Sequence, residues 1–202
     1  MNKLKSSFGN ILMSLTGICL VAGLALSATN RFTAEAIAAS NAATLRNAIK
    51  SVTPEFDNNP SDERYLIATP EGDSLTVYPA RKGEVYAGCA VESRSKKGFS
   101  GLIRVMVGFD KDNKVFAYSV LEHSETPGLG SKMQEWFSVA RNRQSVIGRD
   151  MKEGLLKVVK DGGDVDAITA ATISSRAFLD AINTAFTAFT NTNDASTGAT
   201  KQ

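Results

Sequence analysis

The chain has 202 residues, 43% hydrophobic and 22% charged, so it can bury one core of ordinary domain size beside a membrane segment. Its formal net charge of +2, with basic and acidic residues interspersed, excludes the strong positive field of a nucleic-acid-binding protein. Cys19, Cys89 and one histidine cannot supply the ligands of a zinc, haem or iron–sulfur site, so we expect no metal and any redox chemistry needs an organic cofactor.

The N-terminal segment is apolar. No charged residue lies within residues 6–30, and residues 11–28 are long enough to cross a hydrocarbon core of about 30 Å as a helix. Lys3 and Lys5 precede this run, which predicts a cytoplasmic N-terminus and a periplasmic or otherwise extracytoplasmic main domain. We therefore expect residues 1–30 to form a single-pass anchor in the inner (plasma) membrane. A cleaved signal peptide is the alternative, although the apolar run exceeds the usual length.

Helix formers and apolar spacing predict a second helix over residues 33–52, followed by a polar loop. Short strands are expected at residues 65–68 and 75–78, separated by the turn signal at residues 70–72 (PEG).

Three stronger strand patterns predict an antiparallel meander, with a hairpin loop at residues 110–113 between its last two strands. These strands are residues 85–93, 101–109 and 114–122.

The second half of the chain predicts a helix over residues 131–142, a strand over 155–159 and a last helix over 173–190, whose broad apolar stripe must pack on the sheet. Residues 191–202 are polar and lack periodicity, which predicts a disordered tail. The expected fold class is α+β: a transmembrane helix, then one domain over residues 31–190 with a mainly antiparallel sheet and flanking helices.

Small and hydroxyl residues fill segment 166–175 (DAITAATISS), where the last helix begins. Unpaired N–H groups and the helix dipole favour a phosphate at such a place, and a hydroxyl there could hold the phosphate covalently. An ordinary helix cap formed by Thr169 or Thr172 is the simpler interpretation of this segment alone.

The segment also resembles the flavinylation signature of the FMN-binding domain shared by the G subunit of the Rnf complex and the C subunit of the sodium-translocating NADH:quinone reductase. That signature is Asp, two free positions, Ser or Thr, then Gly-Ala-Thr. The resemblance implies that an FMN transferase recognises Asp166 and esterifies FMN through its phosphate to Thr172. It departs at Ala170, where the family usually has glycine and where alanine disfavours a positive φ. The neighbours implied to contact the cofactor are Thr169, Ala170, Ala171, Ile173 and Ser174.

A second copy of the signature lies at residues 194–200 (DASTGAT), and by pattern alone it would select Thr200. No helix or apolar wall follows it, so the structural context favours Thr172.

Residues 123–130 (HSETPGLG) resemble the Glu-Thr-Pro-Gly-Leu-Gly loop of the same family. Its proline and glycines form a turn that a flat ring can approach closely. The resemblance implies that the loop lies against the flavin, with no catalytic residue, and that the contacts come from Glu125, Thr126, Gly128 and Leu129. Residues 98–101 (GFSG) also resemble the family's Gly-Tyr-x-Gly strand start, although a simple glycine turn explains them equally well.

The resemblance implies an electron-transfer subunit of a membrane-bound, ion-translocating ferredoxin:NAD oxidoreductase of the Rnf type. It would relay electrons through a covalent FMN phosphoester and would not be an independent catalyst. Its partners would be the membrane, the other membrane subunits and the FMN transferase. The alternatives are a C subunit of the quinone reductase, a free-standing extracytoplasmic flavin carrier and, from another class, a non-redox membrane-anchored binding module.

Overall fold

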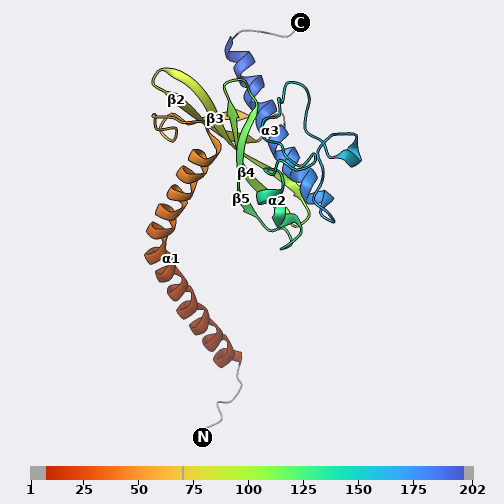
Figure 1. Ribbon diagram of the computed structural model, residues 1–202. Coiled ribbons are helices and arrows are strands. Elements are labelled where there is room, and N and C mark those ends of the chain that lie inside the picture. The colour runs from red at the N-terminus through yellow and green to blue at the C-terminus, as the bar shows by residue number, and fades with distance from the viewer. Residues whose placement is uncertain (1–7, 70, 198–202) are drawn as a thin grey trace. The chain divides into compact units, whose positions relative to one another are not determined.

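The computed structural model describes the backbone of residues 8–69 and 71–197 (Figure 1). Two compact units divide the chain after Leu45. Lys3, Lys5, Pro70 and residues 198–202, which include the end of the second signature copy with Thr200, lie outside the described residues.

The first unit is the N-terminal part of helix α1 (Phe8–Val52), which is long and apolar enough to span a membrane and buries none of its apolar stretch. The sequence predicted two helices here, but the structure has one. No proline interrupts α1, and threonine hydroxyls at the expected break bond back to the preceding turn: Thr29 Oγ1 donates to the Ala25 carbonyl and Thr33 Oγ1 to the Thr29 carbonyl, both at 2.9 Å.

The second compact unit starts at Arg46, and the buried residues of α1 are Ala48, Ile49 and Val52. Its centre is a five-stranded antiparallel sheet in the order β1-β2-β3-β4-β5, so the predicted meander and the α+β class are confirmed. The strands are β1 (Tyr65–Ala68), β2 (Ser74–Lys82), β3 (Val85–Gly98), β4 (Gly101–Asp110) and β5 (Val115–His123).

Helix α3 (Thr172–Thr197) packs on one face of the sheet, as its apolar stripe predicted (Figure 1). Alternate residues of β4 point to this face and are fully buried with Phe178 and Ile182 of α3. Phe178 stacks on Phe137 with ring centroids 4.6 Å apart. The helix continues through Thr197, beyond the end predicted at residue 190.

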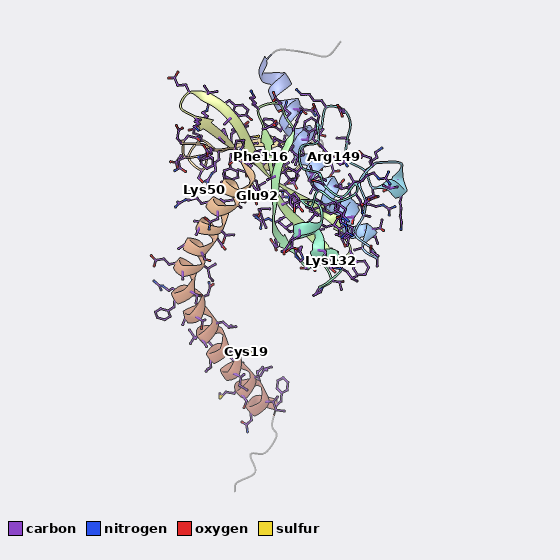
Figure 2. All side chains as sticks on the ribbon, in the orientation of Figure 1. Cys19, Lys50, Glu92, Phe116, Lys132 and Arg149 are labelled. Atoms are coloured by element: carbon purple, nitrogen blue, oxygen red, sulfur yellow. The ribbon has the colours of Figure 1, made fainter. Side chains whose placement is uncertain are left out.

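The opposite face of the sheet carries the last turn of α1. A Cβ at Gly108 of β4 would lie 1.6 Å from the Val52 carbonyl oxygen, so only glycine lets the helix end approach this strand. Of the two cysteines, Cys19 is exposed on α1 (Figure 2), Cys89 is buried in β3, and both are free. Burial raises the pKa of the Cys89 thiol to about 12, which keeps this thiol protonated and unreactive.

The helix predicted over residues 131–142 is reduced to a 3-10 turn, η1 (Gly130–Lys132), and one turn of α-helix, α2 (Met133–Trp136). Tertiary contacts end it early. The Trp136 indole N–H donates to the Asp166 carbonyl at 2.9 Å, while the next residue, Phe137, turns into the core against Phe178.

The strand predicted over residues 155–159 is absent. A loop and a 3-10 turn, η2 (Val159–Asp161), occupy its place, with one isolated parallel bridge between Val158 and Val165. The side-chain amide of Asn183 satisfies both backbone groups of Leu156, each at 2.9 Å, so this segment needs no neighbouring strand.

Candidate functional site

The start of α3 is fixed by one buried serine. The Ser175 hydroxyl accepts the Ile168 N–H and donates to the Ala171 carbonyl, both at 2.9 Å. The Ala171 N–H closes a turn onto the Ile168 carbonyl at 3.0 Å. Together these bonds make Thr172 the first residue of the helix, where backbone N–H groups have no intrahelical acceptor.

Ala170 has φ +61°, in the left-handed region that favours glycine. This is the position at which the resembling family usually has glycine. The backbone follows the glycine-type path with an alanine in it, at a cost of about 1–2 kcal/mol. The side chain is exposed, so the methyl group is accommodated in solvent.

A cavity of about 310 Å³ opens at this helix start, within the size range of small-molecule sites. It joins three parts of the chain: the β3–β4 turn, the loop after β5 and the start of α3. Figure 2 marks this end of the domain with Lys132, which follows that loop. The lining residues are Phe99, Thr126, Leu129, Gly130, Ala170, Ala171, Thr172, Ile173 and Ser174.

Seven of these lining residues were candidates from the sequence: Thr126, Leu129 and the run from Ala170 to Ser174. The structure thus brings the two motifs together, although residues 131–165 separate them in the chain. Thr169 and Gly128 are exposed and do not line the cavity. Gly128 instead donates its N–H to Ser131 Oγ at 2.9 Å, which shapes the loop.

Asp166 lies behind the helix start and not in the cavity. One of its carboxylate oxygens accepts the Arg143 N–H at 3.2 Å, and the other lies 3.7 Å from the Arg143 guanidinium. Its own N–H donates to the Arg143 carbonyl at 2.9 Å. These contacts, with the Trp136 bond to its carbonyl, fix the start of the signature segment.

Glu125 also does not line the cavity but lies directly behind its wall, with only 4% of the residue exposed. Its carboxylate accepts the Ser100 N–H at 2.9 Å and the Ser174 hydroxyl. Glu125 therefore links its own loop after β5 to the β3–β4 turn and to the start of α3. It is not among the residues that line the cavity.

Three residues of the site were absent from the candidates: Phe99, Gly130 and Lys160. Phe99, at the β3–β4 turn, is 67% exposed and forms an apolar wall of the cavity together with Leu129 and Ile173. Lys160, which follows Val159 in η2, places its Nζ 3.4 Å from Thr172 Oγ1. The GFSG resemblance pointed towards Phe99, whereas no local pattern marks Lys160.

The residues present fit a nucleotide phosphate and a flat ring. Thr172 offers a half-exposed hydroxyl, the helix start and Lys160 offer positive charge, and the small side chains of Ala170 and Ala171 leave room near the backbone. Phe99 and Leu129 supply apolar surface for the ring. Within the described residues, no three His, Cys, Asp or Glu side chains are grouped as metal ligands.

A larger hollow of about 470 Å³ lies beyond Ile173, which lines both spaces, but Thr172 does not line it. It contains an ion pair between Arg176 and Asp161 at 2.6 Å. The hydrogen bond from Arg176 holds the pKa of the Asp161 carboxyl below its usual value. Because the predicted attachment residue faces the smaller cavity, that cavity is the candidate flavin site.

Comparison with known proteins bears on this assignment. Residues 98–187 match the FMN-binding domain family. The chain is also similar to the G subunit of the ion-translocating oxidoreductase complex of three bacteria. It is 35% identical to that of Photorhabdus laumondii over 162 residues (76% of each chain) and 34% identical to that of Yersinia pestis over 165 residues (77% of this chain, 78% of the relative). It is 30% identical to that of Shewanella amazonensis over 179 residues (84% of this chain, 82% of the relative).

These findings confirm the resemblance inferred from the two motifs, and the matched region begins at the turn that carries Phe99 and includes most of α3. The chain therefore belongs to the family of G subunits of ion-translocating oxidoreductase complexes, and its globular part is an FMN-binding domain.

Proposed function

We propose that this chain carries FMN esterified through its phosphate to Thr172 and relays electrons within a membrane-bound ferredoxin:NAD oxidoreductase of the Rnf type. The observation that carries the proposal is the half-exposed Thr172 hydroxyl, which lies in the cavity with the Lys160 ammonium 3.4 Å away. FMN, when bound, accepts one or two electrons, so the protein needs only to hold and tune it.

Attachment forms a bond between Thr172 Oγ1 and the phosphorus of FMN. A flavin nucleotide whose phosphate carries a leaving group supplies the FMN, the bond to that group breaks, and the hydroxyl proton is released. The resulting phosphodiester keeps one negative charge, which Lys160 and the positive end of α3 stabilise.

A transferase can reach this segment because Thr169 and Ala170 are exposed beside the attachment residue. We assign Asp166 to recognition by the transferase. Its contacts with Arg143 then serve to present the segment in one conformation.

We further propose that α1 anchors the chain in the inner membrane with the N-terminus in the cytoplasm and the FMN-binding domain outside. A covalent bond is useful in that compartment, because a freely dissociating nucleotide would be lost. Neighbouring membrane subunits of the complex would then donate and accept the electrons.

Coexpression with an FMN transferase, followed by denaturing gel electrophoresis, tests the attachment. Flavin fluorescence should remain with the wild-type chain, disappear in Thr172→Ala, and persist in the matched variants Thr169→Ala and Thr200→Ala. Loss of fluorescence in Thr200→Ala with retention in Thr172→Ala would contradict the assigned residue.

Two alternatives have their own signatures in related experiments. Wild-type protein without fluorescence after coexpression would indicate a non-redox binding module. A flavinylated chain that extracts from membranes without other subunits would indicate a free-standing carrier.

A further inference from the structure

Glu125 has a buried side-chain carboxyl group with two hydrogen-bond partners, Ser100 and Ser174. Oε1 accepts the Ser100 N–H at 2.9 Å and Oε2 accepts the Ser174 hydroxyl, while the residue is only 4% exposed. An ionised carboxylate can accept both of these hydrogen bonds.

Two glycines, Gly98 and Gly130, leave space for the Glu125 carboxyl group. A Cβ at Gly98 would lie 2.7 Å from Oε1, and a Cβ at Gly130 would lie 2.8 Å from Oε2. Both positions therefore require glycine, or the carboxylate would have to move. The turn after β3, the loop after β5 and the start of α3 thus all close around Glu125.

The side-chain carboxyl of Glu125 has no cationic partner in the part of the chain that the structure describes, where its partners are a backbone amide and a hydroxyl. A buried charge acts strongly on its neighbours because little solvent screens it. Ser174 lines the cavity and bonds to this carboxyl group, and Gly130, which also lines the cavity, passes close to it.

We propose that Glu125 carries a negative charge behind the wall of this cavity and thereby lowers the reduction potential of the flavin bound there, acting as a positioning and electrostatic residue. The inference rests on the proposed function, because it needs a flavin in the cavity. Reduction places negative charge on the ring, and a fixed negative charge nearby opposes that charge. The same carboxylate holds Ser174 and the β3–β4 turn in place.

Glu125→Gln separates charge from geometry. The amide oxygen can accept the Ser100 N–H and the amide NH₂ can donate to Ser174 Oγ, so both bonds are replaced while the charge is removed. Spectroelectrochemical titration of the purified flavinylated chain should give a potential more positive than that of the wild type. Glu125→Asp, which keeps the charge, should shift the potential less than Glu125→Gln does.

Glu122→Gln is the matched control. It removes one negative charge from an exposed residue of β5 that pairs with Arg104, and the potential should stay at the wild-type value. Thermal unfolding of the flavin-free Glu125→Gln chain should match that of the wild type, because its hydrogen bonds persist.

An unshifted or more negative potential in Glu125→Gln, with wild-type flavin content, would overturn this inference and leave the proposed function standing. Loss of flavin from Glu125→Gln would also overturn it, since the amide would then fail to replace the carboxylate geometrically. Absence of covalent flavin from the wild type would instead overturn the proposed function itself.

Discussion

The five-stranded sheet and the loops at the start of α3 are stabilised by different kinds of interaction. In the sheet, backbone ladders run along all five strands, and β4 buries every second side chain against α3. At the start of α3, single side chains join distant segments: Ser175 to Ile168, and Glu125 to Ser100 and Ser174.

The difference shows where the chain departs from ordinary structural preferences. An alanine at positive φ, a buried carboxylate without a cation in the described chain and a largely exposed phenylalanine all belong to the loop region. Such departures are expected where a site needs a particular shape and charge instead of maximal stability. The sheet acts as the scaffold, and the loops carry the binding surface.

The largest expected difference is in the free energy of unfolding of two phenylalanine variants, one in the core and one at the cavity. Phe178 is fully buried between Phe137 and Tyr118, so Phe178→Ala should lower the free energy of unfolding by about 3–5 kcal/mol. Phe99→Ala removes an exposed ring from the cavity wall and should change the free energy of unfolding by no more than about 0.5 kcal/mol. Urea denaturation of both flavin-free variants measures this, and similar losses in the two would contradict the division between scaffold and site.

A smaller effect is expected at the strained alanine. Ala170→Gly removes the left-handed penalty and should raise the free energy of unfolding by about 1 kcal/mol, less the added freedom of the unfolded chain. Ala171→Gly, at the buried neighbour whose φ is ordinary, should instead lower it by about 0.5–1 kcal/mol. Destabilisation by both glycines would show that Ala170 is not strained.

The smallest expected effect is the pH dependence of stability that arises from the Arg176–Asp161 ion pair in the larger hollow. Arg176 holds the pKa of the Asp161 carboxyl below its usual value, so this exposed pair stabilises the fold above the unfolded-state pKa. That contribution disappears as the pH falls through the lower, folded-state pKa. NMR titration of the Asp161 side-chain carbonyl should show a low midpoint that rises in Arg176→Gln, and an unchanged midpoint would contradict the pairing.

Sequence patterns predicted the scaffold better than the loops. All five strands were predicted from strand-forming runs and turn residues, which are local signals. The helix expected over residues 131–142 and the strand over 155–159 were wrong because Trp136 and Leu156 are held by distant partners, Asp166 and Asn183. No window of neighbouring residues contains those contacts.

The site was predicted in part for the same reason. The two motifs identified seven cavity residues, and position 170, where the family usually has glycine, takes a positive φ with alanine in place. Lys160 was missed because its contact with Thr172 crosses an irregular loop, and the buried position of Glu125 depends on three separate segments. Motifs predict which residues form the site, whereas the burial of each residue and its contacts are known only from the tertiary structure.

The attachment of FMN to Thr172 is tested most directly by peptide mass spectrometry of the chain coexpressed with an FMN transferase. Trypsin cleaves after Lys160 and Arg176, so Thr169 and Thr172 lie on one peptide, residues 161–176, and Thr200 lies on another. The mass of the FMN group should appear on peptide 161–176, and fragmentation should assign it to Thr172. FMN on the peptide that contains Thr200, or on Thr169, would contradict the account.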